Sequence, residues 1–196
     1  MIPFWTAHGT IDLANLTPQD LTAEILGDTL AKINRFGGRT REPWSVAAHS
    51  VLVERLCPPE IGPWALLHDA HEAFVGDITT PAVDLIATVG RLPGFDDALA
   101  FVKGQIDRAI ARAWGLAVRS LHPDLIRADR IALCAEAMVL IGGKVEHLEP
   151  GDVEDIDRAA TLLFEMRGDW GAARELWLSR VAHYAALGGM TPPAAP

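Results

Sequence analysis

The stretch Trp64-Ala65-Leu66-Leu67-His68-Asp69-Ala70-His71-Glu72 decides how the rest of this chain has to be arranged. An apolar run leads into two imidazoles and two carboxylates. On a helix, His68 and Glu72 share a face, and Asp69 lies about 100° round from His68, so the adjacent pair converges only if the helix ends or tilts there. Such a cluster at the end of a buried helix is costly unless something pairs with it. A divalent cation is the simplest partner, so the stretch predicts a bound metal whose other ligands come from elsewhere.

The composition predicts one helical domain. Apolar residues make up 49% of the 196 positions and charged residues 22%, which is ordinary for a globular protein. The length suits a single well-cored domain, and the abundance of alanine and leucine over β-branched runs favours helices. We therefore expect an all-α domain over residues 1–190 and a frayed tail over residues 191–196.

Charge and cysteine content restrict the partners and the compartment. The formal net charge of −9 argues against a nucleic-acid strand or an anionic membrane, but not against a small nucleotide neutralised by a metal and a few arginines. Cys57 and Cys134 show no paired spacing, which fits a reducing compartment. No signal peptide or apolar run of membrane-spanning length is visible. We expect a cytoplasmic protein, in the host cytoplasm if the chain is encoded by a phage.

Hydrophobic periodicity and turn residues predict a small N-terminal β-hairpin around His8-Gly9, within residues 3–15, followed by helices. On the longest helix, Phe101, Ile106 and Ile110 are expected on the inner face. The expected helices cover residues 17–35, 44–56, 62–74, 78–89, 95–114, 123–141, 152–166 and 170–187.

Two further helices carry a polar group among small and apolar neighbours, His49 in one and Asp129 in the other. Taken alone, His49 could bond to a carbonyl, and Asp129 could pair with Arg127 or Arg130. Together with His68-Asp69, however, they give the order His, His-Asp, Asp along the chain.

This order resembles the HD-domain metal-dependent phosphohydrolase superfamily, which is named after its His-Asp doublet. The blocks Arg35-Phe36-Gly37-Gly38-Arg39-Thr40 with Trp44-Ser45-Val46-Ala47-Ala48-His49, and Leu66 to Ile78, are similar to its compact 5′-deoxynucleotidase branch. They resemble phage-type relatives, which include dATP triphosphohydrolases, still more closely. The resemblance covers about residues 30–135 and implies a single HD-domain helical bundle behind the N-terminal hairpin.

The resemblance implies four metal ligands, each set on a helix: His49, His68, Asp69 and Asp129. Two neutral imidazoles and two carboxylates suit a borderline first-row divalent ion. The family implies one ion of Mn, Co, Zn, Ni or Fe, and a second Mg²⁺ on the substrate phosphates is a further option. Such an ion polarises a phosphoryl oxygen and lowers the pKa of a bound water.

Two carboxylates are candidates for proton transfer. Glu72 lies one helical turn beyond His68 and matches the family's catalytic acid/base. The simpler alternative is a solvated helix carboxylate. Asp77 follows Gly76 in a turn and matches a second catalytic acid, or it could cap the helix expected over residues 78–89.

The expected substrate contacts come from two segments. By resemblance, Arg35 would bind phosphate, and Phe36 would lie against the deoxyribose, although Phe36 could equally belong to the core. Gly37-Gly38 would leave room near the base, with Gly38 lining its pocket. Thr80-Pro81 corresponds to a segment that lines the base pocket in the phage-type enzymes.

Two positions depart from the family pattern. Many relatives carry a lysine where this chain has Val83, so a phosphate contact is either lost or supplied by Arg39 or Arg41. His71 stands where the family usually has a small residue. It could touch the phosphates or a second metal, or simply face a neighbouring helix.

The sequence therefore predicts an enzyme that removes phosphate from a small-molecule 2′-deoxynucleotide, with a dATP-type dNTP triphosphohydrolase that releases the deoxynucleoside as the first hypothesis. A 5′-deoxynucleoside monophosphatase is the alternative within the family. Outside the enzymes, the alternatives are a catalytically idle HD domain that binds a nucleotide as a sensor, and a helical interaction module without metal. The resemblance also implies a homo-oligomer.

Overall fold

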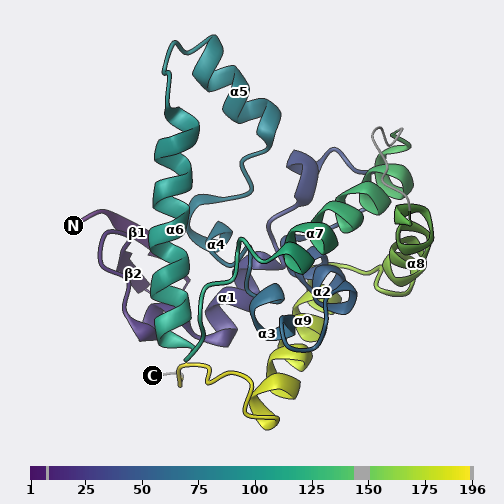
Figure 1. Cartoon of the computed structure of the whole chain (residues 1–196). Coiled ribbons are helices and arrows are strands. Elements are labelled where there is room, and N and C mark those ends of the chain that lie inside the picture. Colours follow the sequence, from purple (N-terminus) through teal and green to yellow (C-terminus); the bar gives the residue numbers. More distant parts are fainter. Residues whose placement is uncertain (8, 144–150, 195–196) are drawn as a thin grey trace.

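Helices make up most of the chain in the computed structural model, which describes residues 1–7, 9–143 and 151–194 (Figure 1). The expected N-terminal hairpin is present: β1 (Pro3–Thr6) pairs antiparallel with β2 (Gly9–Asp12). His8, which was expected in its turn, lies outside the described residues. The prediction of a mostly helical fold with a small N-terminal hairpin is confirmed.

The helices begin and end close to most of the predicted bounds. They are α1 (Ala23–Leu30), α2 (Val46–Leu56), α3 (Gly62–Ala65), α4 (Glu72–Val75), α5 (Thr80–Thr88), α6 (Phe95–Ala113), α7 (Pro123–Glu136), α8 (Asp152–Glu165) and α9 (Trp170–Ala186). Shorter turns of other helical types are η1 (Pro18–Leu21), η2 (Arg35–Gly38) and the π-helical η3 (Ala137–Ile141). No helix in the described ranges has the length and apolar character needed to cross a bilayer.

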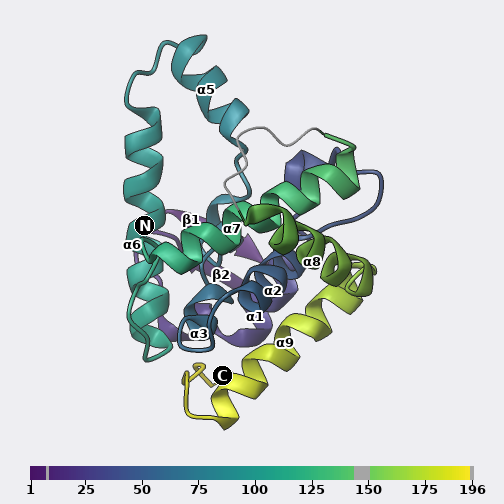
Figure 2. The ribbon, with the colours of Figure 1, turned by 45° about the vertical axis from the view of Figure 1, so that its right-hand side comes forward.

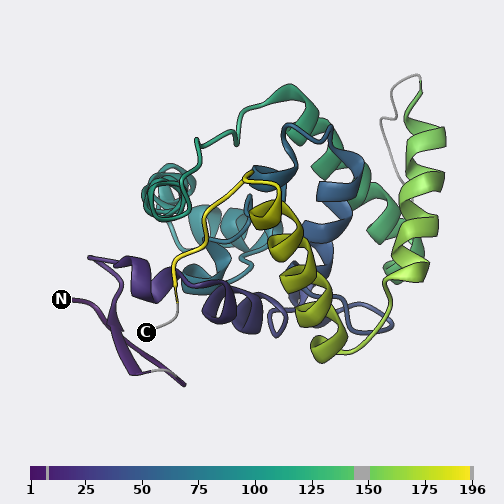
Figure 3. The same cartoon turned by 90° about the horizontal axis from the view of Figure 1, so that it is seen from below.

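Helix α2 lies at the centre of the core, between α7 and α9 (Figure 3). Every residue from Val46 to Glu54 is buried, as expected for a helix that is covered on all sides. At its far end, the buried Glu54 carboxylate accepts hydrogen bonds from Arg180 and from the Tyr184 hydroxyl, both on α9. This places His49, in the middle of α2, in the interior of the protein.

The predicted continuous helix over residues 62–74 is wrong, because a tight turn over residues 66–71 separates α3 from α4. Within it, backbone bonds join residues three apart, such as Glu72 N–H to the Asp69 carbonyl at 2.9 Å. A turn of this kind advances by about 120° per residue instead of about 100°, which changes where neighbouring side chains point. The Trp177 indole of α9 donates to the Leu66 carbonyl at 3.1 Å, so a distant helix satisfies a group that the break exposes.

The first predicted helix also ends earlier than expected, at Leu30 rather than near Arg35. Residues 33–35 instead pair in extended form with residues 44–46: Arg35 N–H donates to the Trp44 carbonyl, and Val46 N–H to the Ile33 carbonyl, each at 2.9 Å. After this bridge the chain turns sharply through η2, where Phe36 has φ of 56°.

Helix α5 and the first half of α6 stand out from the body of the protein (Figures 1 and 2). None of the residues of α5 is buried. Ile106 and Ile110 of α6 are buried as predicted, but Phe101 is 65% exposed, so its expected place on the inner face is wrong. The reason is that this half of α6 packs against α5 and not against the core.

The first residue of the tail that we expected to be frayed is bonded to the body of the protein. Thr191 N–H donates to the Trp114 carbonyl at 2.9 Å, and Met190 beside it is buried. Residues 195 and 196 lie outside the described residues.

We predict that Trp177→Phe destabilises the protein by about 1–3 kcal/mol, because the buried Leu66 carbonyl loses its donor. Trp177→Ala, which also leaves a cavity, should cost about 3–5 kcal/mol. The measurement is urea unfolding of metal-free protein. Trp170→Phe is the matched control on the same helix, since Trp170 is 53% exposed and should change stability by less than about 0.5 kcal/mol. A Trp177→Phe protein as stable as wild type would show that the indole bond contributes nothing.

Candidate metal centre

Three separate segments bring the four predicted metal ligands together. His49 comes from α2, His68 and Asp69 from the turn between α3 and α4, and Asp129 from α7. The His68-Asp69 doublet therefore lies in a tight turn, contrary to the expectation that the doublet lies on a helix.

The distances between the ligand atoms suit a single ion. His49 Nε2 lies 3.5 Å from Asp69 Oδ2 and 3.2 Å from Asp129 Oδ1. His68 Nε2 lies 3.2 Å from the same Asp69 oxygen and 4.0 Å from Asp129 Oδ1. Atoms that each bind one ion at about 2.0–2.2 Å lie about 3–4 Å from one another, so only small adjustments would be needed.

Both imidazoles are held in the tautomer that a metal requires. His49 Nδ1 donates to Glu136 Oε1 and His68 Nδ1 donates to the Ala65 carbonyl, each at 2.7 Å. Because both partners only accept hydrogen bonds, each Nδ1 keeps its proton, and Nε2 is the nitrogen that can bind an ion once its own proton has left. Among the described residues, neither Nε2 atom has a hydrogen-bond partner, and both are buried. Supporting the far nitrogen in this way is the usual arrangement around metal-binding histidines, so these residues fit the expected ion.

Glu136 supports the candidate ligand His49 and was not predicted from the sequence. It is fully buried, and besides His49 it accepts from Trp44 Nε1 at 2.7 Å and from Arg35 at 3.3 Å. Burial acts to raise its pKa, but the charges of His49 and Arg35 outweigh burial and lower it. A signal did exist: Glu136 lies seven residues after Asp129, about two helical turns along the same face of α7.

In the metal-free cluster, neighbouring charges shift the pKa values of the histidines and carboxylates. Burial and the charge of Arg35 act to lower the pKa of His49, but Glu136 and Asp129 outweigh them and raise it to about 10. The pKa of Asp69 lies well below its usual range, since His68, His49 and Arg35 oppose the effect of burial. A bound ion would replace the proton that His49 holds.

A cavity of about 540 Å³ opens beside the cluster and contains most of the other predicted site residues. Gly38 is not among its lining residues and lies at a separate pocket with Arg41. Lys103 of α6 does line the cavity, although the sequence reasoning did not select it. The lining is formed by Arg35, Phe36, Asp69, Glu72, Asp77, Ile78, Thr79, Thr80, Pro81, Lys103, Asp129 and Leu133.

The two candidate acids face this cavity and are both harder to ionise than usual. Burial, followed by the charges of Asp69 and Asp77, raises the pKa of Glu72 to about 8. Burial also raises the pKa of Asp77. The alternative role of Asp77 as a helix cap is wrong, because the N-cap residue of α5 is Thr79. The other alternative, a solvated Glu72, is wrong as well, because Glu72 is only 4% exposed.

The Nδ1 edge of the His71 ring faces α6. Its Nδ1 donates to Asp107 Oδ1 at 2.9 Å, and both side chains are buried. This agrees with the expectation that His71 faces a neighbouring helix.

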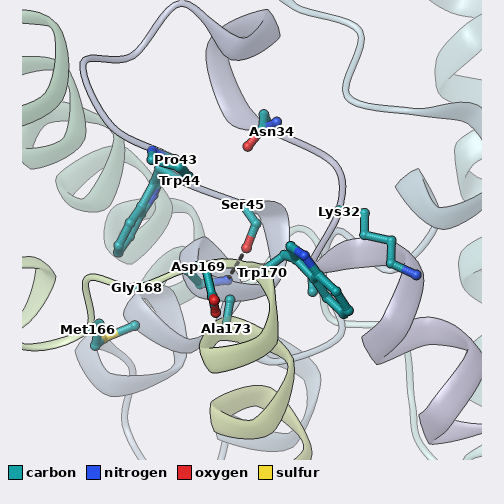
Figure 4. A pocket seen from close by; sticks show the side chains of 12 residues that line it. Lys32, Asn34, Pro43, Trp44, Ser45, Met166, Gly168, Asp169, Trp170 and Ala173 are labelled. Carbon is teal, nitrogen blue, oxygen red and sulfur yellow. Dashed lines mark hydrogen bonds between the residues drawn. The ribbon is translucent and has the colours of Figure 1, made fainter.

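A second cavity, of about 270 Å³, lies between the end of α1 and the start of α9 (Figure 4). Trp44 lines it while donating to Glu136, so this cavity shares a wall with the support of His49. None of the metal-ligand candidates lines it, and its Asp169 carboxylate caps α9 by accepting from Ala172 N–H. Among the described residues, the metal and acid chemistry therefore gathers at the larger cavity.

Comparison with known proteins finds relatives but no matching family model. The chain is 44% identical over 148 residues to "Uncharacterized protein RCAP_rcc00048" of Rhodobacter capsulatus, an alignment that covers 65% of this chain and 71% of that protein. It is 34% identical over 121 residues to "Uncharacterized protein YfdR" of Escherichia coli (strain K12), covering 62% of each chain. The chain thus spans less than two thirds of YfdR, and neither name states an activity.

We predict that metal binding releases at least one proton per ion at pH 7. The raised pKa means that His49 is protonated in the metal-free protein at this pH, so metal affinity should increase with pH up to about 10. Titration calorimetry with Mn²⁺ or Zn²⁺ in two buffers of different ionisation enthalpy measures the protons released. Equal heats in the two buffers would contradict the assigned protonation of the cluster.

Proposed function

We propose that this chain, which belongs to the same family as the Rhodobacter capsulatus protein RCAP_rcc00048, is an HD-type metal-dependent phosphohydrolase that acts on 2′-deoxynucleotides. One observation carries the proposal. Two buried imidazoles have their Nδ1 protons committed to acceptors, and their bare Nε2 atoms meet two carboxylates at the edge of a nucleotide-sized cavity.

The ion would be held by His49, His68, Asp69 and Asp129. A divalent transition metal there polarises a phosphoryl oxygen and lowers the pKa of water. The protein's own part is to keep the ligands in place, and Glu136 does this for His49 at 2.7 Å.

Two basic side chains line the cavity, Arg35 from η2 and Lys103 from α6. Arg35 lies 3.8 Å from Asp69, next to the metal ligands, and is placed to bind a phosphate oxygen. Lys103 Nζ lies 3.9 Å from Glu72 Oε1, too far for a hydrogen bond, so it can turn to a phosphate. Lys103 would supply the contact that Val83 lacks, whereas Arg39 and Arg41 do not line this cavity.

Glu72 is the proposed acid/base. With its pKa raised to about 8, it holds a proton at neutral pH that it can pass to the leaving oxygen. Asp77 lines the same cavity and can assist. A nucleotide sensor has no need of these two carboxylates, which supports an enzyme over a binding domain.

The resemblance to phage-type dATP triphosphohydrolases favours a dNTP as substrate. A second candidate, a 5′-deoxynucleoside monophosphatase, is favoured by the charges of the cavity. Its lining holds two basic side chains against four carboxylates, so a single phosphate is easier to neutralise than three. In both cases Phe36 and the Thr80-Pro81 segment line the part of the cavity left for the nucleoside.

The direct test offers purified protein with Mn²⁺ or Co²⁺ the four dNTPs, the four dNMPs and ATP, and identifies the phosphate species released. We expect dATP to yield deoxyadenosine and intact triphosphate, and ATP to react poorly. Orthophosphate from dNMPs alone would establish the monophosphatase instead. An absence of turnover with every nucleotide would contradict the enzyme and favour the sensor.

Substitutions separate binding of the ion from proton transfer. We expect Glu72→Ala to lower kcat by about 10²–10⁴-fold while the four-ligand centre keeps its metal. Asp129→Ala, which removes a ligand, should lose both metal and turnover. Glu60→Gln, at an exposed position outside the cavity, is the control. Near wild-type turnover by Glu72→Ala would exclude it as the acid/base, and elemental analysis follows the metal in each variant.

A further inference from the structure

His71 is a buried histidine that the proposed function does not use. It is 7% exposed, and its Nδ1 donates to Asp107, which is 6% exposed. A carboxylate only accepts, so the proton sits on Nδ1 and Nε2 carries a lone pair. That Nε2 atom is buried and has no hydrogen-bond partner among the residues that the structure describes. An imidazole nitrogen is costly to leave unpaired in the interior, so a further partner is expected there.

The construction around His71 repeats that of His49. In each case a buried carboxylate from another helix fixes Nδ1: Asp107 of α6 for His71, and Glu136 of α7 for His49. In each case Nε2 is left bare. A carboxylate behind an imidazole is the usual support for a metal ligand.

Two carboxylates lie beside His71. A ring nitrogen of His71 and one oxygen each from Asp69 and Glu72 lie within 4.8 Å of one another. Because Asp107 occupies Nδ1, Nε2 is the nitrogen free to bind. Glu72 Oε2 is likewise buried without a partner, whereas its Oε1 is the atom 3.9 Å from Lys103. The two unpaired atoms are thus a nitrogen and an oxygen from adjacent residues.

The charge around the two clusters also leaves room for more than one ion. Six carboxylates surround the clusters, and the two basic side chains Arg35 and Lys103 offset two of them. Metal binding requires neutral imidazoles and an ionised Glu72, and in that state one divalent cation offsets half of the remaining four charges and a second offsets the rest. The six are Asp69, Glu72, Asp77, Asp107, Asp129 and Glu136.

We propose that Asp69, His71 and Glu72 bind a second divalent cation beside the four-ligand centre, with Asp69 shared between the two sites. One imidazole and two carboxylates suit Mn²⁺, Fe²⁺ or Zn²⁺. This ion is held by three side chains of the protein, which distinguishes it from a Mg²⁺ carried by substrate phosphates. The inference rests on the proposed metal centre, because Asp69 belongs to both.

A second ion changes the roles of Glu72 and Asp77 in the cavity. With the second ion bound, Glu72 is a ligand through Oε2, with Oε1 toward Lys103, and it no longer holds the proton that it carries beside a single ion. Proton transfer to the leaving oxygen then falls to Asp77, which lines the cavity but is not part of the three-residue group. His71, unusual beside the family pattern, acquires a specific role.

The test counts metal per chain. Full-length protein is loaded with Mn²⁺, freed of excess ion by gel filtration and analysed by elemental analysis and by electron paramagnetic resonance. We expect two equivalents and a spin-coupled spectrum for wild type, and one equivalent with an uncoupled spectrum for His71→Ala. His183→Ala, at an exposed position on α9, should keep two. One equivalent in wild type overturns the second site and leaves the four-ligand centre standing. No bound metal removes the proposed function as well.

Asp107→Asn keeps the His71 side chain and serves where His71→Ala fails to fold. The Asn amide can donate to Nδ1 and so place the proton on Nε2. We expect it to weaken the second equivalent of Mn²⁺ by about 10–100-fold and to leave the first unchanged, as measured by calorimetric titration. Two equivalents bound with wild-type affinities in both variants would exclude His71 as a ligand.

Discussion

The structure depends on one buried charge, the carboxylate of Glu136. It sits in the interior and accepts from His49, Trp44 and Arg35, which belong to α2, the segment before it and η2. A buried carboxylate is tolerated only when such partners surround it, and removing one leaves the others unsatisfied. Glu136 therefore orients the His49 imidazole, anchors Arg35 at the cavity wall and joins α7 to α2. One group therefore positions both the candidate metal ligand His49 and the Arg35 side chain that lines the cavity.

The sequence predicted what depends on local pattern and chain order. The spacing of apolar residues predicted the N-terminal hairpin and the bounds of α6, α8 and α9 closely, and the His, His-Asp, Asp order selected four side chains that the fold brings together. Local pattern could not reveal the turn over residues 66–71. Leu66, Leu67 and Ala70 within it favour a helix, and the break is stabilised by Trp177, 111 residues from Leu66. The same limit applies to the end of α1, where pairing with residues 44–46 overrides helix propensity.

The sequence also failed to predict which side chains outside the His, His-Asp, Asp motif line the cavity. Lys103 reaches the cavity from α6, and nothing in its local sequence separates it from a solvated lysine. Gly38 was selected by resemblance to the family, yet the sharp turn of η2 directs it to another pocket. Phe36 and Gly37 adopt positive φ values, which reverse the chain within a few residues and separate Gly38 from Arg35 and Phe36.

The two sides of the cavity differ in how firmly they are held. The metal ligands come from α2, α7 and a turn that α9 clamps, all within the core. The opposite wall includes the start of α5, a nine-residue helix with no buried residue. A helix this short is marginal without tertiary packing, so the free energy that holds this wall in place is small. The candidate metal ligands therefore lie on the rigid side of the cavity, whereas the start of α5 lies on the side that can adjust. Under the proposed function, differences in substrate between relatives are expected to arise in α5 and α6, because the buried Glu136 constrains the side with the candidate ligands.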